Sequence, residues 1–136
     1  MNSRNCNHEW IGILDVLDVL EIVYKLRFKK RIGEINMVKH VILWKLKDEL
    51  SAEEKVKVKA GIKAGLEGLK GIVPGLEAIV VRTEGLASSN ADVMLDSAFT
   101  DEAALKGYAV HPVHVEVANT KVRPFTQTRL CLDFNA

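Results

Sequence analysis

The sequence predicts an α+β protein with a ferredoxin-like β-α-β-β-α-β order, in which four antiparallel strands form one sheet. Three features of residues 37–136 indicate this fold. Runs rich in β-branched residues begin and end the segment, two more such runs lie near its middle, and helical patterns separate the first run from the second and the third from the fourth. This order places the helices on one face of the sheet and leaves the other face open.

The first strand is predicted over Val38–Lys47, "VKHVILWKLK", from its length and its β-branched content. Successive side chains of a strand point to opposite faces of the sheet. One face of this strand therefore carries His40, Ile42, Trp44 and Leu46, and the other carries Val41 and Leu43. Both faces are apolar in the middle, so we expect both to be covered.

The first helix is predicted to begin at Ser51, because "SAEE" has the spacing of a capping box. The Ser51 hydroxyl would accept from the backbone N–H of Glu54, whose carboxylate would reach back to the backbone N–H of Ser51. Apolar residues then recur at helical spacing, with lysines on the opposite side. The sequence "VPG" at Val73–Gly75 ends this helix.

The middle strands are predicted over Leu76–Leu86 and Ala91–Thr100, joined by the turn-forming sequence "ASSN". The stretch "TDEAALKGY" follows as a short helix with acidic residues in its first turn. His111 and Pro112 then indicate the start of a further helix, since proline is favoured at the first helical position. The last strand is predicted over Phe125–Phe134.

The open face of this sheet is predicted to be apolar, through Val41, Leu43 and one side of each later strand. Large exposed apolar patches usually mark an interface. We therefore expect a symmetric homodimer that buries two such sheets face to face.

Residues 1–36 are predicted to form an extension outside the domain of residues 37–136. Within the extension, Trp10–Phe28 has the pattern of an amphipathic helix, and its acidic residues argue against both a membrane span and a signal peptide. A second interpretation is that Met37 is the true start and that residues 1–36 are a translated leader.

The composition is that of one ordinary globular domain. The chain has 136 residues, of which 48% are hydrophobic and 27% charged, with a formal net charge of +1. This balance gives no reason to expect a nucleic acid partner. Cys6 and Cys131 form no ligand-spaced or disulfide pattern, which favours a reduced, cytoplasmic protein. Cys131 lies in an apolar run and is predicted to be a small core residue.

Three stretches together resemble the stress-responsive dimeric α/β barrel (Dabb) domain family: "MVKHVILWKLK", "SAFTDEAALKGYAVHPVHVEV" and "VRPFTQTRLCLDF". The resemblance covers essentially all of residues 37–136 and none of 1–36. It implies a ferredoxin-like protomer and a homodimeric barrel. A few plant members are polyketide cyclases, and the resemblance implies that the residues matching Tyr108 and His114 carry their chemistry, with His40 near the same pocket.

The run "YAVHPVH" supplies the candidate catalytic pair. A neutral His114 can take a proton α to a carbonyl, and the phenol of Tyr108 can stabilise the resulting enolate. The predicted substrate pocket adds a small set of lining residues: His40, Ile42, Trp44 and His111. Trp44 is bulky there and argues against a large polyketide-like substrate.

Other interpretations of these residues remain open. His111 is also the expected N-cap of the helix that Pro112 begins, and the histidines and tyrosine can be packing groups of a non-catalytic stress-response or scaffold homodimer. A cofactor-free oxygenase of the related barrel type is a third function. His111, His114 and Glu116 suggest a metal site only weakly, since no further ligand has suitable spacing, so we predict neither a metal nor a cofactor.

Overall fold

The computed structural model describes residues 16–24 and 37–136. The chain divides into two units, residues 1–35 and 36–136, which are described separately. In the first unit, residues 16–24 form a helix, and the rest of the predicted helix Trp10–Phe28 lies outside the described residues. None of the described helices has the length and hydropathy needed to cross a membrane.

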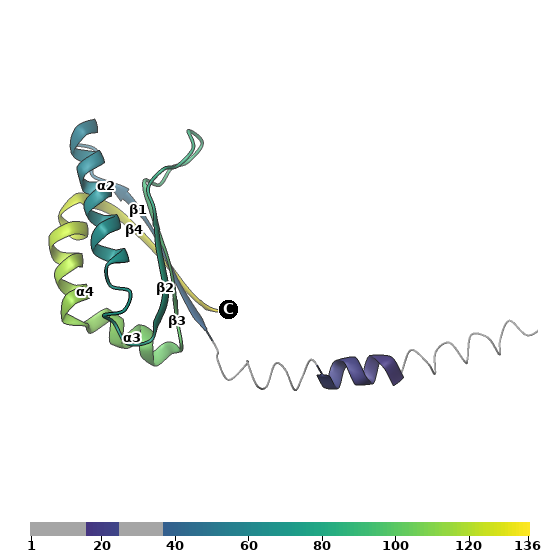
Figure 1. The fold of residues 1–136 in the computed structure, drawn as a ribbon. Helices are drawn as coiled ribbons and strands as arrows, with labels where there is room; N and C mark the ends of the chain where they lie inside the picture. The colour runs from purple at the N-terminus through teal and green to yellow at the C-terminus, as the bar shows by residue number, and fades with distance from the viewer. Residues whose placement is uncertain (1–15, 25–36) are drawn as a thin grey trace, which may run out of the picture. The chain divides into compact units, whose positions relative to one another are not determined.

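The second unit contains one antiparallel sheet of four strands (Figure 1). The strands are β1 (Val38–Leu46), β2 (Leu76–Arg82), β3 (Val93–Phe99) and β4 (Thr126–Asn135), in the spatial order β2-β3-β1-β4. The first and last strands are therefore neighbours, as in a ferredoxin-like fold. The predicted fold class is confirmed, although β2 ends at Arg82, earlier than expected.

The helices α2 (Ala52–Glu67), α3 (Glu102–Val110) and α4 (Pro112–Val117) lie on one side of the sheet (Figure 1). The capping box at the start of α2 is confirmed, because the Ser51 hydroxyl accepts from Glu54 N and the Glu54 carboxylate accepts from Ser51 N. The last predicted helix is not α-helical throughout. After α4 it continues as a π-helix over Ala118–Val122 and a 3₁₀ turn over Arg123–Phe125.

The hydrophobic core lies between the sheet and the helices. The β1 side chains predicted to share a face, from His40 to Leu46, are all buried on this side. They alternate with Lys39, Val41, Leu43 and Lys45, which point to the opposite face. The covering helices approach closely, since a Cβ added at Gly65 would come within 2.8 Å of the Val117 side chain.

The opposite face of the sheet has no helix over it in the described chain, and we call it the open face. Register places on it the apolar side chains of alternate positions from all four strands. Leu130 and Leu132 are each 64% exposed and Phe134 is 42% exposed. The other large apolar members are Val41, Leu43, Val80 and Met94.

The prediction that Cys131 is a core residue is wrong, because Cys131 is exposed. Cys131 lies opposite Ile42 and points to the same side of the sheet as the helices. However, β4 is an edge strand, and its residues on that side are exposed as well. An apolar run in a strand predicts burial only where another layer covers it.

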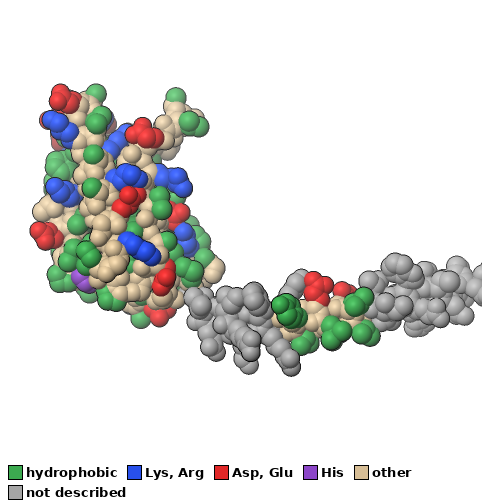
Figure 2. Space-filling model, in the orientation of Figure 1, with side chains coloured by type: hydrophobic (Ala, Val, Ile, Leu, Met, Phe, Trp, Pro, Cys, Tyr) green, Lys and Arg blue, Asp and Glu red, His purple; other side chains and the backbone are tan. Residues whose placement is uncertain are grey.

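The surface charges are mixed. On the face that Figure 2 shows, lysine and arginine side chains are interspersed with aspartate and glutamate over the described domain. This distribution differs from the clustered basic surface of a nucleic-acid-binding protein.

Candidate functional site

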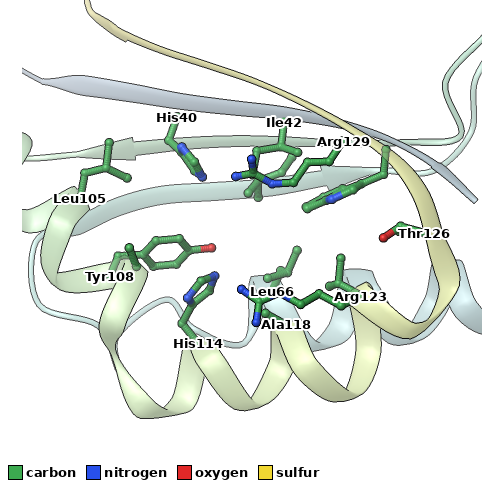
Figure 3. A pocket seen from close by; sticks show the side chains of 14 residues that line it. His40, Ile42, Leu66, Leu105, Tyr108, His114, Ala118, Arg123, Thr126 and Arg129 are labelled. Carbon is green, nitrogen blue, oxygen red and sulfur yellow. The ribbon is translucent and has the colours of Figure 1, made fainter.

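The candidate site is a cavity of about 210 Å³ between the sheet and the helices, which we call the inner cavity. Five of the six residues predicted from the sequence line it: His40, Ile42, Trp44, Tyr108 and His114. Figure 3 shows His40 and Ile42 projecting from the sheet toward Tyr108 and His114 on the helices. Strand β1 and the α3–α4 segment, far apart in sequence, therefore meet at this cavity.

The sixth residue, His111, does not line the inner cavity. Its Nδ1 accepts a hydrogen bond of 3.2 Å from the backbone N–H of Val113, and His111 is the N-cap of α4. Pro112 occupies the first position of that helix, where its missing N–H is tolerated. The break places Tyr108 in the last turn of α3 and His114 in the first turn of α4.

Tyr108 and His114 lie against each other, with ring centroids 4.0 Å apart and the ring planes inclined by 34°. Tyr108 also contacts Phe99 and His40, at centroid distances of 5.0 and 5.9 Å. Aromatic neighbours on three sides hold the Tyr108 ring in one orientation. The ring is only 2% exposed, so its hydroxyl is presented to the cavity and not to bulk solvent.

Two polar atoms at the inner cavity are buried without a hydrogen bond of standard geometry, the Tyr108 hydroxyl and His114 Nδ1, although the His114 ring lies near the backbone of Ala109. Such groups carry a free-energy cost, because their lost contacts with water are not replaced. A bound molecule with a polar group at this position would provide the missing partner. Two orphaned atoms beside one cavity are therefore typical of a binding site.

Burial also sets the protonation of this pair. Burial is the main cause that lowers the pKa of His114 below its usual value, and the backbone of Ala109 partly offsets it. Burial raises the pKa of Tyr108 well above its usual value, with a smaller opposite effect from the charge of Arg129. At neutral pH His114 is consequently a neutral base and Tyr108 a protonated hydrogen-bond donor.

His40 is oriented by Asp133 from the neighbouring strand β4. Register places these residues opposite each other, and the Nδ1–H of His40 donates to the Asp133 carboxylate at 2.5 Å. The backbone carbonyl of His40 accepts a hydrogen bond of 2.8 Å from the buried hydroxyl of Ser97. With Nδ1 donating to a carboxylate, the other ring nitrogen, Nε2, is an acceptor in the neutral ring.

His40, Cys131 and Asp133 form the group of potential metal ligands found in the described chain, with ligand atoms within 4.8 Å of one another. A histidine, a thiolate and a carboxylate would suit zinc with one coordination position open. However, desolvation and the hydrogen bond to Asp133 raise the pKa of the Cys131 thiol, with a smaller opposite effect from the Arg129 guanidinium beside it. A neighbouring cation disfavours a divalent ion, so the geometry favours a hydrogen-bonded cluster. The three residues considered in the sequence, His111, His114 and Glu116, are not grouped in this way.

Two arginines at the inner cavity were missed from the sequence. Arg129 lies on β4 opposite Trp44, and Arg123 lies in the 3₁₀ turn before that strand. Both have side chains directed toward His40, Tyr108 and His114 (Figure 3). Alternation in the last strand could have placed Arg129 on the helix side, but only once β4 was known to pair with β1.

A wider cavity of about 570 Å³ adjoins the inner cavity. The two share His40, Leu105, Ala109 and Arg129 in their linings. The wider cavity alone includes the carboxylates Glu102 and Asp133. We call it the outer cavity. His40 and Arg129 thus stand at the boundary between the two.

Comparison with known proteins identifies related domains. The model of the stress responsive A/B barrel domain (Dabb) family matches residues 38–136. A dimeric ferredoxin-like protein of unknown function from Bacteroides fragilis is 30% identical, with a TM-score of 0.70, and the match covers 74% of this chain and 97% of that protein. No curated protein matches the chain.

Two more distant structures have described activities. A hydroxynitrile lyase from Passiflora edulis is 17% identical with a TM-score of 0.58, covering 75% of this chain and 94% of the lyase. A Bacteroides thetaiotaomicron protein, provisionally described as an antibiotic biosynthesis monooxygenase, is 18% identical with a TM-score of 0.59, covering 76% and 92%. At these identities the likeness shows the fold alone, and one fold supports many reactions.

Proposed function

The chain belongs to the stress responsive A/B barrel domain family, and from this membership we propose that it binds a small carbonyl-containing molecule in the inner cavity and acts on it by acid–base chemistry. The observation that carries the proposal is the pair of orphaned atoms, the Tyr108 hydroxyl and His114 Nδ1, beside one cavity. A carbonyl oxygen would accept from Tyr108, and His114 would reach the adjacent carbon.

In the proposed step, the neutral His114 takes a proton from the carbon next to the carbonyl. The electron pair of that C–H bond moves to the carbonyl oxygen, and the Tyr108 hydroxyl stabilises the enolate by hydrogen bonding. In a cyclisation, the enolate carbon then bonds to a second carbonyl carbon of the same molecule, and the protonated His114 gives its proton to the alkoxide that forms there, so the step is balanced without a cofactor. This chemistry would serve a cyclase- or lyase-like reaction.

The working unit is proposed to be a homodimer formed through the open face. Leu130, Leu132 and Phe134 are apolar side chains exposed along one strand of that face. The Bacteroides fragilis relative is described as dimeric. Burying two such faces against each other removes this apolar surface from water.

The test is native mass spectrometry followed by a thermal-shift screen with small aldehydes, ketones and thioesters. We expect a dimer, and at least one carbonyl compound that raises the melting temperature of the wild type but not of His114→Ala or Tyr108→Phe. His111→Ala is the matched control, since His111 comes from the same segment but does not line the inner cavity. Unchanged stabilisation in both site variants would contradict the site assignment.

The alternative function is a non-catalytic scaffold homodimer with structural histidines. It predicts that His114→Ala lowers the melting temperature and that no compound of the screen raises it. A cofactor-free oxygenase would instead consume oxygen when an electron-rich substrate is added. The same purified protein distinguishes these outcomes.

A further inference from the structure

We propose that the ligand of the inner cavity is an anion, specifically a monocarboxylate with an apolar body, and that Arg123 and Arg129 bind its carboxylate. This inference rests on the proposed function and names its substrate class. Figure 3 shows the two guanidinium groups entering the cavity from different sides, Arg129 from the sheet and Arg123 from the helical layer. Both point toward His40, Tyr108 and His114.

The charge of the lining supports an anion. The inner cavity is lined by two arginines and two histidines and by no aspartate or glutamate. The nearby carboxylate Asp133 belongs to the outer cavity, where it accepts from His40. An anion in the inner cavity would therefore face cationic groups at close range without an opposing carboxylate in the same wall.

Neither arginine is neutralised by an ion pair within the described residues. Arg123 donates to the side-chain oxygen of Asn119, which is neutral. Arg129 lies beside the thiol of Cys131. Two guanidinium groups at one cavity repel each other. An anion bound between them would offset this repulsion and accept charge-assisted hydrogen bonds from both.

The groups around the inner cavity also affect the pKa values of Tyr108 and His114. Besides burial, electrostatic interactions with the neighbouring His40, Arg123 and His111 lower the pKa of His114, and the positive charge of Arg129 acts in the same direction on the pKa of Tyr108. The groups around the inner cavity thus act as a cationic environment. Such an environment would also stabilise the enolate that the proposed reaction forms.

The apolar part of the lining argues for a carboxylate that carries a hydrocarbon body. Ile42, Trp44, Leu66, Leu95 and Leu105 form much of the wall. A small inorganic anion would leave this surface without a partner, whereas an aryl or alkyl group would cover it. The arginines would then fix the orientation of the ligand against Tyr108 and His114.

The test uses the full-length protein and isothermal titration calorimetry with three matched probes: benzoate, benzamide and inorganic phosphate. We expect benzoate to bind at least about tenfold more tightly than benzamide, because hydrogen bonds from a guanidinium to a carboxylate are roughly twice as strong as those to a neutral amide. Phosphate should bind more weakly than benzoate. Equal affinities for benzoate and benzamide would overturn the inference.

Variants locate the binding. Arg129→Gln and Arg123→Gln should each weaken benzoate binding about tenfold and leave benzamide unaffected, and Arg129→Lys should have an intermediate effect. Arg82→Gln is the control, since Arg82 lies on β2 outside the inner cavity. Circular dichroism melts of each variant establish that it is folded. Benzoate binding that none of the lining variants changes would be adventitious and would also overturn the inference.

The failure of this inference and of the proposed function are distinguishable. If benzamide binds as tightly as benzoate and this binding is lost in Tyr108→Phe, the proposed ligand pocket is supported and the proposal of an anionic ligand is rejected. If none of the three probes binds the wild-type protein, the proposal of a carboxylate ligand is rejected. The thermal-shift screen with carbonyl compounds then tests the proposed function independently.

Discussion

The rings of Tyr108 and His114 lie 4.0 Å apart across the break between α3 and α4, yet the Tyr108 hydroxyl and His114 Nδ1 both lack a hydrogen-bond partner within the described chain. The two rings are therefore well packed even though one polar atom of each has no hydrogen-bond partner. The rings stabilise the fold, while the polar atoms carry a cost that folding alone does not explain. This separation allows a mutation to test one role without the other.

Tyr108→Phe removes the orphaned hydroxyl and keeps the ring. We expect the free energy of unfolding to stay unchanged or to rise by about 1 kcal/mol, because an unsatisfied buried group is removed. Binding of any carbonyl ligand should be lost. Tyr108→Ala, which also removes the ring, should lower the free energy of unfolding by about 3–5 kcal/mol. Urea denaturation measures both, and a clear loss of stability in Tyr108→Phe with binding retained would show a structural hydroxyl.

The lowered pKa of His114 predicts a pH dependence of stability. Below its usual value of 6.5, the unfolded chain takes up a proton at this residue, whereas the folded chain resists protonation because the ring is buried beside His40, His111 and Arg123. The stabilisation that His114 adds to the free energy of unfolding is therefore complete above pH 6.5, and it is lost as the pH falls through the pKa of His114 in the folded protein. Denaturation midpoints between pH 8 and 5 should show this decline, and His114→Gln should reduce it.

Nuclear magnetic resonance gives an independent measurement. Titration of the His114 ring protons should yield a pKa below the 6.5 of an unperturbed histidine. A value above 6.5 would contradict both the buried environment and the role of His114 as a neutral base.

Leu132→Glu should convert the proposed dimer into a monomer. Leu132 is 64% exposed on the open face, and a carboxylate there would be desolvated in a face-to-face dimer. Val110→Glu is the control, since Val110 is 75% exposed on α3 and lies outside the sheet. Light scattering after gel filtration measures the mass. A dimer retained by Leu132→Glu would show that the interface lies elsewhere.

The sequence was sufficient for the elements and for most of the inner cavity. His40, Ile42 and Trp44 could be placed together because strand alternation is a local rule, and Tyr108 and His114 because His111-Pro112 marks a helix start. Arg129 and Cys131 could not be placed, since their surroundings depend on β4 pairing with β1 at an edge that the helices leave uncovered. Local alternation assigns a side to such residues but not their burial.

The π-helix after α4 was also missed. Residues Ala118–Val122 carry no local pattern that separates a wide turn from an α-helix. Val122 is nevertheless buried and lines the inner cavity, and Arg123 follows it directly. The wide turn therefore helps to place one side of the candidate site.

Removal of residues 1–36 should leave the domain intact. The family match begins at residue 38, and residues 36–136 form their own unit. We expect the protein of residues 37–136 to keep the melting temperature and the oligomeric state of the full chain, as measured by differential scanning calorimetry and light scattering. A large drop in melting temperature would show that the preceding segment stabilises the domain.

Gly75 is predicted to be essential for the placement of α3, the helix that carries Tyr108. Gly71 and Gly75 both have positive φ angles, of 84° and 79°, so alanine at either position is strained by about 1–2 kcal/mol. A Cβ at Gly75 would also lie 2.5 Å from the Ala104 Cβ of α3, whereas a Cβ at Gly71 would have no atom within 4 Å.

Gly75→Ala should therefore lower the free energy of unfolding by about 1–3 kcal/mol more than Gly71→Ala, because α3 must move to relieve the contact. The movement should also weaken ligand binding in the Gly75 variant alone, since Tyr108 lies about one turn after Ala104 on the same helix. Urea denaturation and calorimetric titration measure the two effects. Equal destabilisation by both substitutions would mean that backbone strain alone matters and that α3 is free to adjust around Gly75.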